Sequence, residues 1–493
     1  MNILLITLDQ FRGDCLSSAS HPLVQTPNLD ALAEGGVRLA RHFSQATPCA
    51  PGRACLYTGT YQMNNRVVAN GTPLDDRFDN VARAGRRAGY APALFGYTDQ
   101  GIDPRVASGP DDPGLSDYEG VLPGFDAVLD LAGYMRPWLD WVRSQGHDVP
   151  NDIEGVLASS GERPAEVSIS HFLTDRALAW IDDQTVPWFA HLSYLRPHPP
   201  YAAAGHWAER YDPADVDLPI EARPAHPLHE FAMSHDLAGA PTDEAAMRHL
   251  RAQYYGMIGE VDEQLGRLWA GLRDREQWDD TFVVVTADHG EQLGDHGLRE
   301  KLGYFPQSHH VVGIVRDPRH PEAHGTVVDR FTENVDVFPT LCDAMGLDVP
   351  AQVDGLPLTP FLQGEAPPWW RDAAHWEYDW RGQLIGDEAA PWPWDRMLER
   401  QHLAVLCRED VAYVQFGNGT WLCFDLVEDP TWRTTVDDPA VVLPLAQEML
   451  TWRSQHADRT LSDMLLERGG IGRWPVLPDG WGVKPAAAST SPP

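Results

Sequence analysis

Three separated segments of this 493-residue chain carry side chains that bind metals or take part in catalysis. They are Asp9-Gln10, which follows the apolar run ILLITL, residues 49–53 (CAPGR), and residues 288–291 (DHGE), which follow TFVVVTA. Carboxylate oxygens and an imidazole nitrogen gathered at one sheet edge suit Mn²⁺, Ca²⁺, Mg²⁺ or Zn²⁺ and leave coordination positions for a substrate oxygen. The pattern therefore indicates metal-assisted chemistry.

Each of these residues also has a simpler interpretation. An aspartate at the end of a strand commonly caps the helix or loop that follows. A cysteine such as Cys49 is more often a small buried hydrophobic residue than a nucleophile. Taken singly, each segment favours a structural role, and it is their combination that favours a site.

The elements that must position these segments alternate between strands and helices. Strand-like runs lie near residues 2–8, 91–96, 187–193 and 281–287, and helical patterns near 28–35, 78–88, 135–144, 170–184 and 244–274. This alternation predicts an α/β fold with a large mixed, mostly parallel sheet sandwiched by helices. A central parallel strand ends in polar residues at its carboxyl edge, as residues 2–8 do before Asp9.

The pattern changes after about residue 365. The segments HLAVLC, VAYVQF and TWLCFDL, with a turn at Gly417-Asn418-Gly419, predict a smaller antiparallel sheet, and a helix is expected near 439–456. We expect a catalytic domain at 1–370, an α+β subdomain at 371–475, and a disordered or oligomer-contact tail at 476–493. Trp392 and Trp394 either wall a pocket for an apolar ester group or pack between domains or subunits.

Composition excludes several classes of protein. The chain has 38 Lys and Arg against 72 Asp and Glu, a net charge of −34, which excludes nucleic acid as a partner. An anionic substrate would need a local group of positive charges. No apolar run is long enough to span a membrane, and the N-terminus lacks the features of a signal peptide. Six cysteines form no disulfide framework, so we expect a cytoplasmic protein without a membrane partner.

Residues 49–53 also fit a known modification signal, C-x-P-x-R, as Cys49, Pro51 and Arg53. The segments LLITLDQFRGD, TPNLDALAEGGVR and TADHGEQLGDHG and the residue Lys301 accompany it in order. Together they resemble the sulfatase branch of the alkaline phosphatase superfamily. The segments NNRVVANGTPLDDR, GYAPALFGYT, RPHPPY and HWEYDW are similar to those of its phosphonate monoester hydrolase and arylsulfatase group, so the resemblance extends over residues 2–385.

The resemblance implies an alkaline phosphatase-like fold and a metal-dependent hydrolase of sulfate monoesters, phosphonate monoesters or phosphodiesters. Cys49 would be converted to formylglycine (3-oxoalanine), whose hydrated aldehyde attacks the ester and forms a covalent intermediate. One divalent ion, Mn²⁺, Zn²⁺ or Ca²⁺, would be bound by Asp9, Asp288, His289 and the modified Cys49, with Gln10 as a neighbour. The imidazole ligand favours Mn²⁺ or Zn²⁺.

The resemblance also implies contacts to a small anionic ester substrate. Arg53 would orient the nucleophile, Lys301 would bridge it to the substrate, and His198 would protonate or stabilise the leaving group. Asn70 and Tyr97 match positions that contact the substrate oxyanion.

Asp99 departs from the pattern of the group, which has a threonine there. A carboxylate at this position would repel an anionic group or attract a cationic substituent, so we expect an altered specificity.

Two other functions stay open from the sequence. One is a phosphodiesterase or phosphatase-type relative with an unmodified nucleophile, against which Cys49 argues because such enzymes use Ser or Thr. The other is an inactive binding protein on the same scaffold, against which the complete set of site residues argues. The partners implied are a formylglycine-generating enzyme or its equivalent and a second copy of the chain, in a homo-oligomer (dimer or tetramer).

Overall fold

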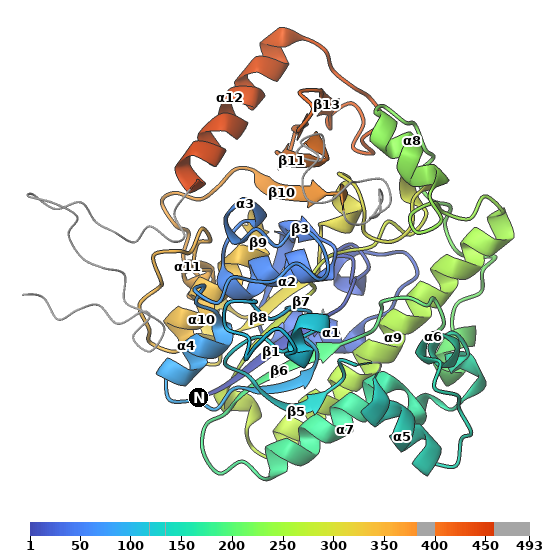
Figure 1. Ribbon diagram of the computed structural model, residues 1–493, viewed down its shortest axis with the longest axis vertical. Coiled ribbons are helices and arrows are strands. Elements are labelled where there is room, and N and C mark those ends of the chain that lie inside the picture. Colours follow the sequence, from blue (N-terminus) through green and yellow to red (C-terminus); the bar gives the residue numbers. More distant parts are fainter. Residues whose placement is uncertain (118, 134, 382–399, 458–493) are drawn as a thin grey trace, which may run out of the picture.

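The computed structural model describes residues 1–117, 119–133, 135–381 and 400–457. Trp392, Trp394 and the predicted tail at 476–493 lie outside the described residues. Two sheets, of eight and five strands, organise the described chain (Figure 1). None of the described helices combines the length and apolar character needed to cross a membrane.

The larger sheet confirms the predicted mixed, mostly parallel architecture. Its strands, in spatial order, are β5 (Asp126–Asp130), β4 (Ala93–Gly96), β6 (Phe189–Tyr194), β1 (Asn2–Leu8), β7 (Thr281–Thr286), β8 (Gly313–Arg316), β2 (Val37–Phe43) and β9 (Thr326–Glu333). Among the described strands, β8 runs antiparallel to both neighbours and the other pairings are parallel. β1 lies between β6 and β7, and all seven of its residues are buried.

Helices cover both faces of this sheet. Alternate residues of β1 enter two different cores: Leu4 and Ile6 face one, Ile3 and Leu5 the other. The first core is covered by α1 (Pro27–Glu34), α5 (Arg136–Ser144), α6 (Ile153–Ala158), α7 (Ile169–Asp182) and α9 (Glu244–Asp274). The second is covered by α2 (Cys49–Thr58), α4 (Val81–Arg87), α10 (Val337–Ala344) and α11 (Thr359–Leu362). α3 (Gln62–Asn65) follows α2.

The smaller sheet contains the predicted antiparallel meander. Its strands are β10 (Ala374–Asp379), β11 (His402–Cys407), β12 (Val411–Phe416) and β13 (Trp421–Asp425), joined at the β10 edge by β3 (Ala46–Thr47). α12 (Pro439–His456) and α8 (Pro227–Ser234) pack against it. The pairing of β3 with β10 is parallel, and β3 ends two residues before Cys49. The smaller sheet therefore anchors the segment that leads into α2.

Candidate metal centre and active site

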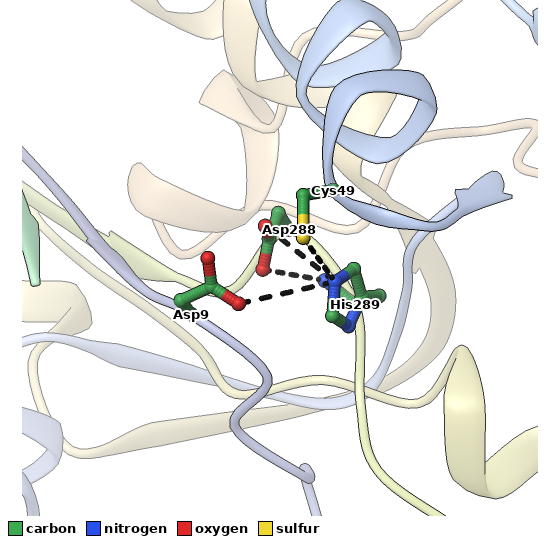
Figure 2. A group of neighbouring side chains, drawn as sticks. All are labelled: Asp9, Cys49, Asp288 and His289. Carbon is green, nitrogen blue, oxygen red and sulfur yellow. Dashed lines mark hydrogen bonds and ion pairs between the residues drawn. The ribbon is translucent and has the colours of Figure 1, made fainter. Parts of the chain in front are cut away.

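The three segments singled out in the sequence meet at one edge of the larger sheet. Asp9 directly follows β1 and Asp288 follows the neighbouring parallel strand β7, while Cys49 is the first residue of α2. The ligand atoms of Asp9, Cys49, Asp288 and His289 all lie within 4.8 Å of one another, and the four residues are buried (Figure 2). Sequence positions 240 residues apart thus form one compact cluster of donor atoms.

His289 presents a lone pair to this cluster. Its Nδ1 lies 3.0 Å from the carbonyl oxygen of Gly290, which can only accept, so Nδ1 carries the proton. Its Nε2 lies 3.3 Å from Cys49 Sγ, 3.9 Å from Asp9 Oδ1 and 3.7 Å from Asp288 Oδ2. Burial lowers the pKa of His289 to about 3, so the ring is neutral. An unprotonated nitrogen therefore faces two carboxylates.

This donor set fits a divalent cation. Asp9 Oδ1 is buried and has no hydrogen-bond partner among the described residues, although it faces His289. Burial and then the charge of Asp9 raise the pKa of Asp288. Burial acts the same way on Asp9, but its interactions with His198 and then with Arg53 hold its pKa below the ordinary value. Lone pairs and carboxylates packed this closely repel one another unless a positive ion lies between them.

Arg53 holds the two carboxylates of the cluster in place. It is fully buried, with Nη2 3.0 Å from Asp9 Oδ2 and Nε 3.0 Å from Asp288 Oδ2. Nη1 donates to Ser193 Oγ, at 2.8 Å, at the end of β6. A third carboxylate, Asp99, lies 3.3 Å from Nε. Because the guanidinium is planar and rigid, it holds these groups in fixed orientations.

Tyr97 and Asn70 are both hydrogen-bonded to neighbours of the site. The Tyr97 hydroxyl donates to Asp9 Oδ2 at 2.7 Å, and Arg53 lies 4.5 Å from the centre of its ring. Asn70 Oδ1 accepts from the backbone N–H of Ala50 at 3.0 Å. In this arrangement Tyr97 supports a metal-ligand candidate, and half-buried Asn70 keeps its amide NH₂ for other contacts.

Asp99 turns towards Arg53 inside the protein. Burial raises its pKa to about 7, and Asp9 adds to that effect while Arg53 opposes it. A divalent cation held by the nearby donor cluster would lower this pKa, since an opposite charge favours the carboxylate.

The unmodified Cys49 thiol is a poor nucleophile in this setting. Burial and then the negative charge of Asp9 raise its pKa well above the ordinary value of a thiol. At neutral pH the sulfur is therefore protonated, and only the thiolate attacks efficiently.

Lys301 and His198 form a pair beside the cluster. Lys301 Nζ lies 2.9 Å from His198 Nε2 and 2.8 Å from Gln10 Oε1, and His198 Nδ1 lies 2.7 Å from the carbonyl oxygen of Pro199. Burial by itself lowers the pKa of Lys301, but the neighbouring Cys49 and Glu300 raise it by more than burial lowers it. Lys301 therefore keeps its positive charge. Burial and then Lys301 lower the pKa of His198. His198 therefore donates from Nδ1 and accepts the Lys301 proton at Nε2.

The structure adds residues to which sequence reasoning assigned no role. Glu291 is fully buried, accepts from Gln10 Nε2, and accepts from the Tyr201 hydroxyl at 2.9 Å. Burial and Glu300 raise its pKa to about 7. The sequence offered one signal for each of these two residues: Glu291 lies in the DHGE segment, and Tyr201 lies in RPHPPY. Ser193 gave none, because its strand is apolar around it.

A scan against family models matches residues 1–347 to the family described as Sulfatase. A second model, described as N-sulphoglucosamine sulphohydrolase, C-terminal, matches residues 294–451. The chain is 36% identical over 502 residues to the multifunctional alkaline phosphatase superfamily protein PehA of Trinickia caryophylli, with 94% of this chain and 96% of that protein covered.

Solved structures agree with these matches. The phosphonate monoester hydrolase of Agrobacterium radiobacter superposes with a TM-score of 0.88 and 42% identity, covering 96% of this chain and 100% of that one. The phosphonate monoester hydrolase SpPMH from Silicibacter pomeroyi gives a TM-score of 0.85 and 35% identity, covering 95% and 98%.

Proposed function

The chain belongs to the sulfatase family of the alkaline phosphatase superfamily and is an ester hydrolase, and from that premise we propose a specific reaction. It hydrolyses sulfate monoesters, phosphonate monoesters or phosphodiesters, using formylglycine at Cys49 and one divalent metal ion. The observation that carries this proposal is the buried cluster of Asp9, Cys49, Asp288 and His289, whose donor atoms lie within 4.8 Å of one another and whose two carboxylates contact Arg53.

Two groups that the chain must acquire would supply the central chemistry. Formylglycine would supply a hydrated aldehyde as nucleophile, which the protonated Cys49 thiol is not. A divalent ion would supply Lewis acidity towards a substrate oxygen, and the imidazole of His289 favours Mn²⁺ or Zn²⁺.

The residues of the chain orient these groups and move protons. Arg53 holds Asp9 and Asp288 in place, and Asn70 fixes the first turn of α2 through the Ala50 N–H. Lys301 places positive charge beside the reacting atoms and shares a proton with His198. That pair would protonate the departing oxygen. We include a formylglycine-generating partner and a homo-oligomer in the proposal.

The test of this proposal combines a mass measurement with an activity assay. Intact-mass spectrometry of the purified protein should give a mass about 18 Da below that of the unmodified chain, as conversion of –CH₂SH to –CHO requires. Aryl sulfate, aryl phosphonate and aryl phosphodiester are then assayed side by side, with and without a chelator.

Cys49→Ser is the matched variant. It should lose at least about a hundredfold in kcat/KM for every substrate, because a hydroxyl cannot replace the hydrated aldehyde. An unmodified mass with full activity, or a serine variant as active as the parent, would overturn the proposed nucleophile.

A further inference from the structure

Asp99 is a buried carboxylate without a place in the donor cluster. Its side chain is 7% exposed, and one of its oxygens lies 3.3 Å from Arg53 Nε. Arg53 contacts two other carboxylates, Asp9 and Asp288, and both belong to the group that fits a metal ion. The charge of Asp99 is therefore the one in this trio that a bound ion would leave least compensated.

The carboxylates around the site outnumber the fixed cations. Two permanent cations face the reacting centre, Arg53 and Lys301. The carboxylates in contact with them are Asp9, Asp99, Asp288 and Glu300. A divalent ion in the donor cluster brings the positive charges about level with the negative ones. Each negative charge of a substrate is then added to a site without a surplus of positive charge, so binding a dianion costs more than binding a monoanion.

We propose that Asp99 is a specificity-determining residue whose negative charge makes the site select monoanionic over dianionic esters. This inference rests on the proposed function and narrows its substrate class. Sulfate monoesters, phosphonate monoesters and phosphodiesters carry one charge, whereas a phosphate monoester carries nearly two above its second pKa of about 6. In a low-dielectric site the repulsion between Asp99 and the second charge is only weakly screened.

The backbone determines which substitutions test this. Asp99 has φ +52°, a left-handed conformation that Asn and Gly adopt readily and β-branched residues do not. Asp99→Asn keeps the size of the side chain and loses its charge, and Asp99→Gly removes both. Arg53 keeps Asp9, Asp288 and Ser193 as partners in either variant.

The first measurement is equilibrium binding and needs no turnover. Sulfate and methanesulfonate are tetrahedral anions of similar size with two charges and one. In the metal-loaded protein, titration calorimetry should show that both Asp99 variants improve the Kd for sulfate relative to methanesulfonate by about tenfold. Asp130→Asn, at an exposed position in β5, removes the same charge from the surface and should leave the ratio unchanged.

The second measurement is the ratio of kcat/KM for 4-nitrophenyl phosphate to that for methyl 4-nitrophenyl phosphate at pH 8. It should rise about tenfold in both variants. Unchanged ratios in both assays, with equal losses for the two substrates, would mean that Asp99 merely supports Arg53 and would overturn the inference. A shifted binding ratio in a protein that hydrolyses neither ester would retain the role of Asp99 and reject the proposed function.

Discussion

Lys301 and His198 share one proton at the edge of the site. His198 donates its Nδ1 proton to the carbonyl oxygen of Pro199. The proton between Lys301 Nζ and His198 Nε2 therefore belongs to the Lys301 ammonium group. In this state His198 therefore carries no proton at Nε2 that it could give directly to a leaving group, and its predicted role of protonating or stabilising that group would involve Lys301. His198 receives that proton from Lys301, or it orients Lys301 to deliver it directly.

His198→Asn tests this pair through the leaving group. A general acid contributes about a hundredfold or more when the departing oxygen is basic, and little when it leaves as a stable anion. We expect kcat/KM for alkyl esters to fall by about a hundredfold and that for 4-nitrophenyl esters by less than about tenfold.

The control is His147→Asn, in the turn after α5, which should change neither value. Equal losses for the two ester classes in His198→Asn would contradict a role in proton transfer and leave a purely structural one.

At the scale of elements, the site depends on how closely α2 approaches the loop after β7. Gly52, in the first turn of α2, lies directly against the backbone of that loop. A Cβ at this position would overlap the carbonyl oxygen of Asp288 and lie 3.0 Å from that of Ala46. A residue in a variable slot of the C-x-P-x-R signal thus has a packing constraint of its own.

Gly52→Ala should push α2 away from Asp288 and His289. Overpacking of this kind costs about 1–3 kcal/mol of stability. We expect Mn²⁺ or Zn²⁺ affinity, measured by titration against a competing chelator, to fall at least about tenfold, since ligand atoms must be held within a few tenths of an ångström.

Gly109→Ala is the matched control, because a Cβ there would have no neighbour within 4 Å, and its metal affinity should equal that of the parent. Unchanged metal affinity in Gly52→Ala would show that the loop after β7 moves to make room for the Cβ without disturbing the ligands. It would contradict the packing constraint at Gly52.

The elements that carry the site were the predictable ones. β1 and β7 are continuous apolar runs that end in acids, and α9 and α12 have the predicted bounds of 244–274 and 439–456. β2, β8 and β9 gave no comparable signal: β2 (VRLARHF) mixes cations with apolar residues, and β8 has four residues. Their pairing is fixed by contacts distant in sequence, which a local pattern does not encode.

The site divides in the same way. Motif residues such as Asp9, Cys49 and Asp288 are recognisable in the sequence by their type and position, and the structure brings them together. The orientation of Asp99 towards Arg53 and the contact of Tyr97 with Asp9 depend on how the segment after β4 packs against α2 and the end of β1. Spacing alone does not determine such contacts.

At the scale of the whole molecule, a strongly negative net charge coexists with a site that contains buried cations. The net charge is −34, yet Arg53 is fully buried and Lys301 is 8% exposed. Surface charges are screened by salt over about 8–10 Å, whereas buried charges act with little screening. A small anion therefore responds to the local charges of the site more than to the charge excess at the surface.

Acidification tests the interior of the molecule through His42. This β2 residue is fully enclosed, with Nδ1 3.0 Å from Thr332 Oγ1 and Nε2 3.0 Å from Asn334 Oδ1. Asn334 in turn donates to the carbonyl oxygen of Ala287, the residue before Asp288. Burial lowers the pKa of His42 to about 3. His42 thus connects the end of β9 to the loop that carries the metal-ligand candidates, and its burial disfavours the charged form of the ring.

Because the folded-state pKa lies below the unfolded value of about 6.5, the unfolded chain binds more protons between these pH values. The contribution of His42 to the free energy of unfolding is complete above pH 6.5 and falls as the pH is lowered towards 3. His42→Gln removes this titration, so the stability advantage of the parent over the variant should shrink by about 2 kcal/mol from pH 8 to pH 5. Urea unfolding followed by tryptophan fluorescence measures it, with His147→Gln as the control for loss of a histidine outside the sheet. An advantage of the parent that stays constant with pH would show that His42 is protonated in the folded protein without cost, and that the connection between β9 and the loop tolerates the charge.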